Sequence, residues 1–228
     1  MNHLKIINDY LKARGERGRL PDTGYPFVTI SRQAGAGGHL TAYVLTSSFM
    51  KERDLDLFGG WHVFDREICQ VVAMDPTLHS SIADLLCEGS KSAMQEFLED
   101  LLSGESRQYK QHKKTFEIVR MLAIVGKVVL VGRAAAFVTR GLPHGIHMRI
   151  VAPIDKRVRW MAKKLNISRE EARKTIDRQD AERKRMVKNF FSRDIDDPLN
   201  YDMVWNTAMV NPDEIAAAVT DIIKSRRK

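Results

Sequence analysis

The sequence predicts an α/β fold in which a parallel sheet is covered by helices on both faces. Two observations predict it: short apolar runs recur along the chain, and longer stretches with helical spacing of apolar residues separate them. With 228 residues, 43% of them apolar, the chain can bury one core of good size, so we expect a single domain over residues 1–228. Parallel sheets bind ligands at the carboxyl ends of their strands, and we expect the functional residues there.

The predicted elements alternate in order along the chain. Five short runs are predicted to form strands: Phe27–Ser31, Trp61–Phe64, Val128–Val131, Met148–Ala152 and Tyr201–Trp205. Helical patterns cover most of residues 1–20, 40–50, 66–125, 155–164, 168–188 and 212–224. We interpret residues 1–24 as an accessory N-terminal segment, and the helix over 168–188 opens with the capping-box pattern Ser168-Arg-Glu-Glu171.

Composition narrows the class of protein. Cys69 and Cys87 lack the spacing of metal sites or redox motifs, which favours a reduced, cytoplasmic setting. No apolar run approaches the roughly 18 residues of a membrane span, and the N-terminus lacks the apolar core of a signal peptide, so we expect a soluble protein without a membrane partner. The formal net charge is +8, and the segment 156–193 alone holds 14 Lys or Arg against 5 Asp or Glu. A phosphorylated ligand or a nucleic acid fits this charge.

A glycine-rich loop, Arg32-Gln-Ala-Gly-Ala-Gly-Gly38, lies between the first strand and the next helix. Gly35, Gly37 and Gly38 allow consecutive backbone N–H groups to point at one anion near the positive end of the helix dipole. Laid over the Walker pattern, however, the loop has Arg32, Gly38 and His39 where Gly, Lys and Ser or Thr belong. The loop therefore predicts a phosphate site without the usual lysine.

A dinucleotide-binding fingerprint is the rival interpretation of this loop. Gly35 and Gly37 match its first two glycines, and Asp54 or Asp56 lies at a suitable distance for a ribose contact. Leu40 stands where the third glycine belongs. The long helical stretch that follows the second strand also disfavours a compact dinucleotide-binding unit.

Arginines mark two further strand ends. Arg133 directly follows a buried strand and Gly132, where a guanidinium can grip phosphate oxygens with two hydrogen bonds. Arg178, Asp180 and Arg183 lie within about a turn and a half of one helix, so one helical face carries two guanidiniums and a carboxylate. We expect that face to close over a phosphoryl group.

Five short motifs in order carry a resemblance to a known family. They are Ile30-Ser-Arg-Gln-Ala-Gly-Ala-Gly-Gly38, Phe64-Asp-Arg-Glu-Ile68, Val131-Gly-Arg133, Asp180-Ala-Glu-Arg183 and Asp197-Pro-Leu-Asn-Tyr-Asp-Met-Val-Trp-Asn-Thr207. Over roughly residues 27–224 the chain resembles the cytidylate kinase-like proteins among the nucleoside monophosphate kinases, in the branch whose phosphate loop reads Ser-Arg-Gln-x-Gly-x-Gly-Gly. The resemblance implies a three-layer P-loop kinase fold with a five-stranded parallel sheet. It also implies a helical acceptor-binding insertion near 66–125 and a short lid near 177–197.

The resemblance also implies an activity, ATP-dependent phosphoryl transfer to a nucleoside monophosphate, most simply CMP or dCMP, with Mg²⁺ as cofactor. It implies that Arg133 holds the acceptor phosphate and that Asp180 and Arg183 line the closing lid, and we expect catalytic roles for these three residues. Arg32 is our candidate to replace the missing lysine, also with a catalytic role. The residues it implies for nucleotide binding are Ser31, Arg32, Gln33, Gly35, Ala36, Gly37, Gly38, His39, Asp65 and Arg178. The sequence offers no metal site of its own, since Asp65 is the only strand-end carboxylate and Thr41 lies two residues beyond the usual hydroxyl position.

Two departures from the family pattern keep other functions open. Cytidylate kinases carry Gly-Lys-Gly in the loop and Asp-Gly-Arg-Asp after the third strand, whereas this chain has Gly38-His39 and Val131-Gly-Arg-Ala134. A catalytically inactive, nucleotide-binding relative is therefore one alternative. A nucleic-acid-binding protein is the other, supported by the basic segment and the tail Lys224–Lys228, although aromatic residues are sparse there. The sequence leaves the oligomeric state open.

Overall fold

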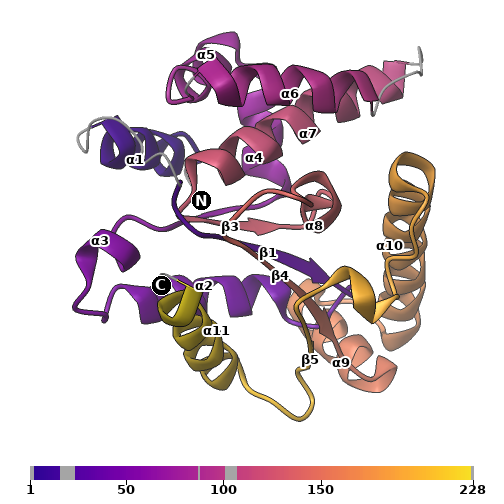
Figure 1. Ribbon diagram of the computed structural model, residues 1–228. Helices are drawn as coiled ribbons and strands as arrows, with labels where there is room; N and C mark the ends of the chain where they lie inside the picture. The colour runs from indigo at the N-terminus through magenta and orange to yellow at the C-terminus, as the bar shows by residue number, and fades with distance from the viewer. Residues whose placement is uncertain (1–2, 16–23, 87, 101–106, 227–228) are drawn as a thin grey trace.

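The computed structural model describes residues 3–15, 24–86, 88–100 and 107–226 and contains the predicted parallel sheet (Figure 1). Its five strands are β1 (Phe27–Arg32), β2 (His62–Phe64), β3 (Val128–Val131), β4 (Gly145–Val151) and β5 (Met203–Asn206). Every pairing is parallel, and the strand order is β2-β3-β1-β4-β5. Because β1 is central, the loop that follows it lies between the ends of β3 and β4.

Helices cover both faces of the sheet and make it the middle of three layers (Figure 1). On one face α2 packs with α11 against the apolar side chains of β1, β3 and β4. On the other face α4 and α7 lie over the sheet, with α1 and α5 beside them. The helices are α1 (His3–Gly15), α2 (Gly38–Phe49), α3 (Leu55–Phe58), α4 (Arg66–Met74), α5 (Pro76–Ala83), α6 (Glu88–Asp100), α7 (Arg107–Val125), α8 (Ala135–Val138), α9 (Ile154–Leu165), α10 (Arg169–Phe191), the 3₁₀ turn η1 (Pro198–Asn200) and α11 (Pro212–Arg226).

Most predicted elements are present with small changes at their ends. The strand Val128–Val131 has the predicted bounds, and the capping box of Ser168 and Glu171 forms at the start of α10. Strand β4 begins at Gly145, three residues earlier than predicted, because the register pairs Gly145 with Phe27. The described part of the segment 66–125 is helical throughout its regular structure, in α4 to α7.

The N-terminal helix is part of the core. The side chains of Ile7 and Tyr10 on α1 are fully buried, and the Tyr10 hydroxyl donates to the carbonyl of Gly126 at 3.1 Å. Arg14 donates to the carbonyl of Gly60 at 3.2 Å, which ties α1 to the segment before β2. Residues 1–2 and 16–23 of the predicted accessory segment lie outside the described residues.

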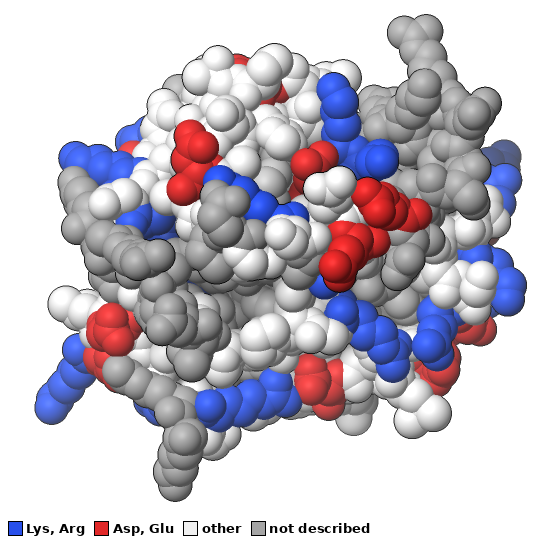
Figure 2. Space-filling model, turned by 45° about the horizontal axis from the view of Figure 1, so that its top comes forward, with Lys and Arg blue, Asp and Glu red and all other residues white. Residues whose placement is uncertain are grey.

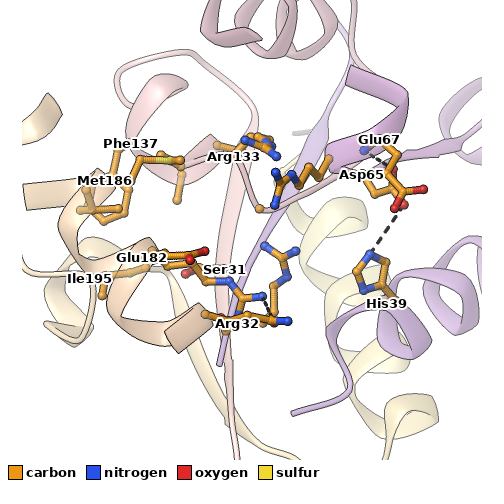
Figure 3. A pocket seen from close by; sticks show the side chains of 18 of the residues that line it. Ser31, Arg32, His39, Asp65, Glu67, Arg133, Phe137, Glu182, Met186 and Ile195 are labelled. Atoms are coloured by element: carbon orange, nitrogen blue, oxygen red, sulfur yellow. Dashed lines mark hydrogen bonds and ion pairs between the residues drawn. The ribbon is translucent and has the colours of Figure 1, made fainter. Parts of the chain in front are cut away.

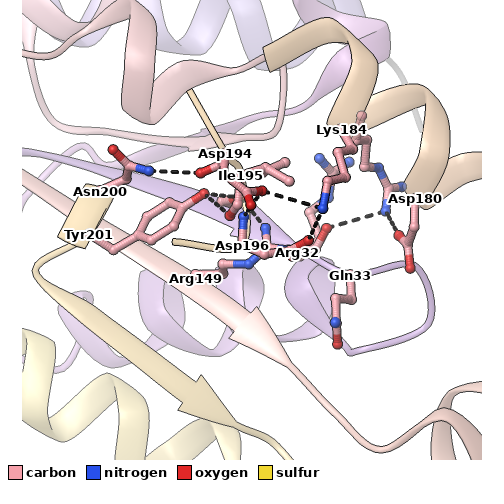
Figure 4. Close-up of polar contacts among 12 residues, drawn as sticks. Arg32, Gln33, Arg149, Asp180, Lys184, Asp194, Ile195, Asp196, Asn200 and Tyr201 are labelled. Carbon is pink, nitrogen blue, oxygen red and sulfur yellow. Dashed lines mark hydrogen bonds and ion pairs between the residues drawn. The ribbon is translucent and has the colours of Figure 1, made fainter. Parts of the chain in front are cut away.

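Helix α10 is continuous through the segment 177–191, where the sequence predicted the start of a lid. It ends at Ser192, whose left-handed conformation caps it. The loop that follows is held from several sides (Figure 4): Arg149 of β4 bonds Asp196 at 2.5 Å, and the hydroxyl of Tyr201 donates to the carbonyl of Ile195 at 2.9 Å. Whether the segment 177–197 acts as a lid stays a prediction.

Within the described part of the chain, none of the helices combines the length and apolar character that a membrane span requires.

Candidate functional site

A cavity of about 380 Å³ lies at the carboxyl ends of β1, β2 and β3, under α10 (Figure 3). It is where parallel sheets of this kind place their ligands. Most of its charged lining residues are arginines. The lining consists of Ser31, Arg32, His39, Asp65, Arg66, Glu67, Gly132, Arg133, Ala134, Ala135, Ala136, Phe137, Arg178, Gln179, Glu182, Arg183, Met186, Val187 and Ile195.

Arg32 crosses the cavity floor because two glycines leave room for it. A Cβ on Gly38 would lie 3.0 Å from Cβ and Cγ of Arg32, and a Cβ on Gly132 would overlap the Arg32 guanidinium. Burial, and then the nearby charges of Arg183 and Arg133, lower the pKa of Arg32 to about 9. The position predicted to replace the lysine thus holds a partly buried cation beside two other guanidiniums.

Arg133 stands on a turn whose backbone is unusual. Gly132, Arg133 and Ala134 have φ values of +85°, +54° and +53°, and for Arg133 and Ala134 this left-handed conformation is strained. The Nη2 atom of Arg133 is buried and has no hydrogen-bond partner among the described residues. Burial and the charge of Arg66 lower the pKa of Arg133 to about 10. A buried, unsatisfied guanidinium nitrogen at the cavity wall fits an anionic ligand.

Arg183 and Asp180 have different positions, although they lie on the same helix. Arg183 lines the cavity and donates to the carbonyl of Arg32 at 3.3 Å. Asp180 does not line the cavity: it accepts hydrogen bonds from the backbone N–H of Ala34 at 2.7 Å, from Arg157 at 2.7 Å and from Arg183 at 3.1 Å. Its carboxylate therefore connects α10 to the glycine loop in this structure, and a catalytic role for Asp180 stays a prediction.

The glycine loop itself is tightly fastened to the protein. Gly35 has a φ of +77°, and a Cβ there would lie 2.9 Å from the carbonyl oxygen of Arg157. The side-chain oxygen of Gln33 accepts from the N–H of Ala152 at 3.1 Å, so Gln33 is structural in this conformation. Helix α2 begins directly after Gly37, and no side chain caps it. Gln33, Gly35, Ala36, Gly37 and Gly38 do not line the cavity; the lining residues on either side of them are Ser31 and Arg32 at the end of β1 and His39 in α2.

The dinucleotide interpretation of this loop is wrong. In a dinucleotide-binding sheet the second strand pairs with the first, whereas here β3 lies between β2 and β1. Asp54, the proposed ribose ligand, caps α3 by accepting from the N–H of Leu57 at 3.0 Å.

Asp65 joins the loop side of the cavity to α4. Its Oδ1 caps α4 by accepting from the N–H groups of Glu67 at 2.9 Å and Ile68 at 3.1 Å, and its Oδ2 lies 3.7 Å from Nε2 of His39. Burial opposes ionisation of Asp65, but the contact with His39 and the two backbone hydrogen bonds outweigh it and lower its pKa to about 2. Asp65 is thus a carboxylate at physiological pH.

The described residues form no ready-made metal site. None of their carboxylates, histidines or cysteines gather in groups of three or more that could hold an ion. Oδ2 of Asp65, which lines the cavity, lies 3.7 Å from His39, and the hydroxyl of the buried Thr41 donates to the carbonyl of Gly37 at 3.2 Å. A magnesium ion here depends on ligands that a nucleotide and water bring.

The cavity gathers predicted residues from distant parts of the chain and adds others. Ser31, Arg32, His39, Asp65, Arg133, Arg178 and Arg183 all line it, as far as the structure describes the chain. Arg66 was missed, although it stands inside the motif Phe64–Ile68, and so was Glu182, although it lies one turn from Arg178 on the same face of α10. The apolar wall around Phe137 carries no sequence signal of its own, because apolar residues after a strand are ordinary core residues.

Comparison with known proteins agrees with this geometry. The chain is 29% identical over 129 residues to a cytidylate kinase from Methanocaldococcus jannaschii, a match covering 54% of this chain and 72% of that protein. A crystal structure of an uncharacterized protein from Eubacterium ventriosum superposes with a TM-score of 0.63 at 18% identity, covering 88% of this chain and 99% of the other, which supports the fold. The cytidylate kinase-like family itself matches residues 27–209. The chain therefore belongs to the cytidylate kinase-like family.

Proposed function

We propose that the protein transfers the γ-phosphoryl group of ATP to a nucleoside monophosphate, with CMP or dCMP as the preferred acceptor. The observation that carries the proposal is the convergence of Arg32, Arg133 and Arg183 on one cavity at the strand ends. Phosphoryl transfer requires alignment of two phosphates and neutralisation of the charge on the transferring group, and little covalent chemistry.

Each guanidinium has a part in this proposal. The buried Nη2 of Arg133 donates to the acceptor phosphate, because it has no hydrogen-bond partner among the described residues. Arg32 takes the place of the missing lysine and bridges the donor phosphates from below. Arg183, held by Asp180, stabilises the charge on the transferring group. The N–H groups at the start of α2 hold the donor phosphates, and Mg²⁺, when bound to ATP, withdraws charge from the phosphate oxygens.

In this proposal, α10 excludes water from the reaction. Arg183 of α10 reaches the carbonyl of Arg32, at the start of the glycine loop. In the loop after α10, Asp196 accepts from Arg149 at 2.5 Å and from Lys184 at 3.3 Å (Figure 4). We propose that the segment 177–197 opens for substrate entry and closes into the conformation described here. The helical segment 66–125 contributes Arg66 and Glu67 to the acceptor side.

The test is diphosphate formation from MgATP with CMP, dCMP, UMP, AMP and GMP. Arg133→Ala and Arg183→Ala should each lower kcat/KM by on the order of 10² to 10³, the usual cost of removing a donor to the transition state. Arg185→Ala is the matched control, because Arg185 is an exposed arginine of the same helix that does not line the cavity. Equal losses in all three variants would contradict the assigned roles.

If none of the five monophosphates is converted, calorimetry with ATP on the same preparation distinguishes an inactive nucleotide-binding protein from a protein that does not bind nucleotides. Binding without turnover would favour the inactive nucleotide-binding relative. Absence of binding would contradict the phosphate site and with it the proposed function.

Nucleic acid binding has less support in the structure than in the sequence. Part of the basic segment has other partners: Arg157 is buried between the glycine loop and Asp180, and Arg178 and Arg183 line the cavity. On the face shown in Figure 2, basic and acidic side chains are interspersed, without one continuous basic surface. A salt-dependent shift of labelled RNA or DNA at physiological ionic strength, without any response to nucleotides, would overturn the kinase proposal.

A further inference from the structure

The cavity has two chemically different ends, and α10 contributes to both (Figure 3). Gln179, Glu182, Arg183, Met186 and Val187 recur at spacings of three and four residues, so they share the face of α10 that lines the cavity. Arg183 belongs to the end with the other guanidiniums. Met186 and Val187 belong to an apolar wall, which is completed by Ala135, Ala136, Phe137 and Ile195.

Glu182 lies between these two ends and differs from the other acidic residues of the cavity. Three carboxylates line it. Asp65 caps α4 and contacts His39, and Glu67 pairs with His3 at 3.6 Å. Glu182 is an exposed residue that lines the cavity (Figure 3), and its charge favours the nearby Arg183 cation, but no described residue forms a hydrogen bond or ion pair with it.

A carboxylate in the lining of an arginine-rich cavity limits which ligand groups can bind beside it. Its charge repels a phosphate, so it does not assist the anionic part of the ligand. A carboxylate accepts hydrogen bonds and donates none, so the ligand group beside it must be a donor. The neighbouring wall of Phe137 and Met186 suits a flat, largely apolar ring. A nucleobase with an exocyclic amino group meets both requirements, since carboxylates accept well from the amino group of cytosine.

We propose that Glu182 accepts a hydrogen bond from the amino group of the acceptor's base, whose ring packs on the wall formed by α8 and α10. This inference rests on the proposed function and specifies its substrate. Uracil carries a carbonyl oxygen where cytosine carries the amino group, and that oxygen would face the carboxylate. Glu182 therefore selects CMP over UMP.

The experiment measures binding of CMP, dCMP and UMP by calorimetry, without ATP, so that it does not depend on turnover. The parent protein should bind CMP at least about tenfold more tightly than UMP, as one discriminating hydrogen bond allows. In Glu182→Gln the ratio should fall towards one, because an amide both donates and accepts. Glu170→Gln is the matched control: Glu170 lies on the same helix, is exposed and pairs with Lys174 at 2.7 Å, and its variant should keep the parent ratio.

Three outcomes would overturn the inference, and they are distinguishable from one another. An unchanged CMP to UMP ratio in Glu182→Gln, with binding intact, removes the role of Glu182 but leaves the kinase proposal standing. A change in the CMP to dCMP ratio instead would assign Glu182 to a ribose hydroxyl. Failure of the parent protein to bind any of the three nucleotides would overturn both the inference and the proposed function.

Discussion

The glycine loop over residues 33–38 and the turn over 132–134 follow neighbouring strands, yet they are stabilised in opposite ways. In the loop, the N–H of Ala34 bonds Asp180, the carbonyl of Ala34 accepts from Arg157, and the carbonyl of Ala36 accepts from Thr207 at 2.9 Å. In the turn, Arg133 and Ala134 have positive φ values, and the buried Nη2 of Arg133 has no hydrogen-bond partner in the part of the chain that the structure describes. The loop is thus held in place by hydrogen bonds from several elements. The turn instead retains backbone strain and a guanidinium nitrogen that donates to no described residue.

This difference makes the turn after β3 the better candidate for ligand contacts. Strain and unsatisfied buried groups persist in folded proteins where the surroundings enforce them, and they concentrate at functional sites. The sequence drew attention to the glycine loop first, because glycines are conspicuous. The turn after β3 carries the stronger structural indication of ligand binding.

The largest effect is expected from Arg133→Gly, which removes the guanidinium and relieves the backbone strain of the turn. We expect kcat/KM to fall by on the order of 10³, because the donor to the acceptor phosphate is lost. We also expect the free energy of unfolding to rise by about 1 kcal/mol, because glycine adopts a φ of +54° without strain. Steady-state kinetics and urea unfolding measure the two effects.

His144→Gly is the control for the turn. His144 also has a left-handed φ, +60°, and lies outside the cavity lining. It should show the gain in stability with unchanged activity. A marked loss of stability in Arg133→Gly would show that the turn is not strained and would break the comparison.

The next largest effect concerns the fastening of the loop by Asp180. In Asp180→Ala, Arg157 stays buried without its carboxylate and the N–H of Ala34 loses its acceptor. We expect the free energy of unfolding to fall by about 3 kcal/mol, the usual cost of leaving one partner of a buried ion pair alone. Thermal unfolding of the variant checks this.

The double variant Asp180→Ala, Arg157→Leu tests the cause of that loss. It leaves no buried charge unpaired, so it should recover part of the stability that the single variant loses. If the double variant is instead less stable than Asp180→Ala, the loop depends on the other hydrogen bonds of Arg157, to the carbonyls of Ala34 and Ala152.

A smaller loss of stability than that of Asp180→Ala is expected from Gly132→Ala, a position where the turn contacts Arg32 at the end of β1. The new Cβ overlaps the Arg32 guanidinium and the φ of +85° disfavours alanine, so we expect a loss of about 1 to 2 kcal/mol with a reduced affinity for ATP. Gly141→Ala has a similar φ, +82°, with open space at the Cβ, and should lose stability alone. Equal ATP affinities in the two variants would show that Arg32 does not contribute to the binding of ATP.

The fold could be predicted from the sequence because local patterns determine it. The β-branched run Val128–Val131 is apolar on both faces and predicts a buried parallel strand with correct bounds. The four-residue helix α3 was missed because it is too short for a periodic pattern. The start of β4 was missed because its first residues, from Gly145 to His147, have mixed polarity and are fixed by pairing with Phe27–Thr29.

The sequence predicted those residues of the candidate site that directly follow a strand. Arg32, Asp65 and Arg133 each follow a strand, and the parallel sheet brings them together. The structural role of Asp180 depends on Ala34, 146 positions away, and no local pattern reveals that contact. For Glu182 the informative observation is that it lines the cavity and that no described residue forms a hydrogen bond or ion pair with it. This is known only once the neighbouring side chains are placed.

The central position of β1 has a consequence for how the chain folds during synthesis. Val28 pairs with Val129 and with Ile146, both more than 100 positions further along the chain. At the usual 5–20 residues per second, β1 therefore leaves the ribosome roughly 6 to 24 s before its second partner strand exists. Phe27, Val28 and Ile30 are fully or almost fully buried in the finished protein but lack their partner strands during this interval. We expect the nascent chain to present this apolar strand to chaperones until β4 emerges.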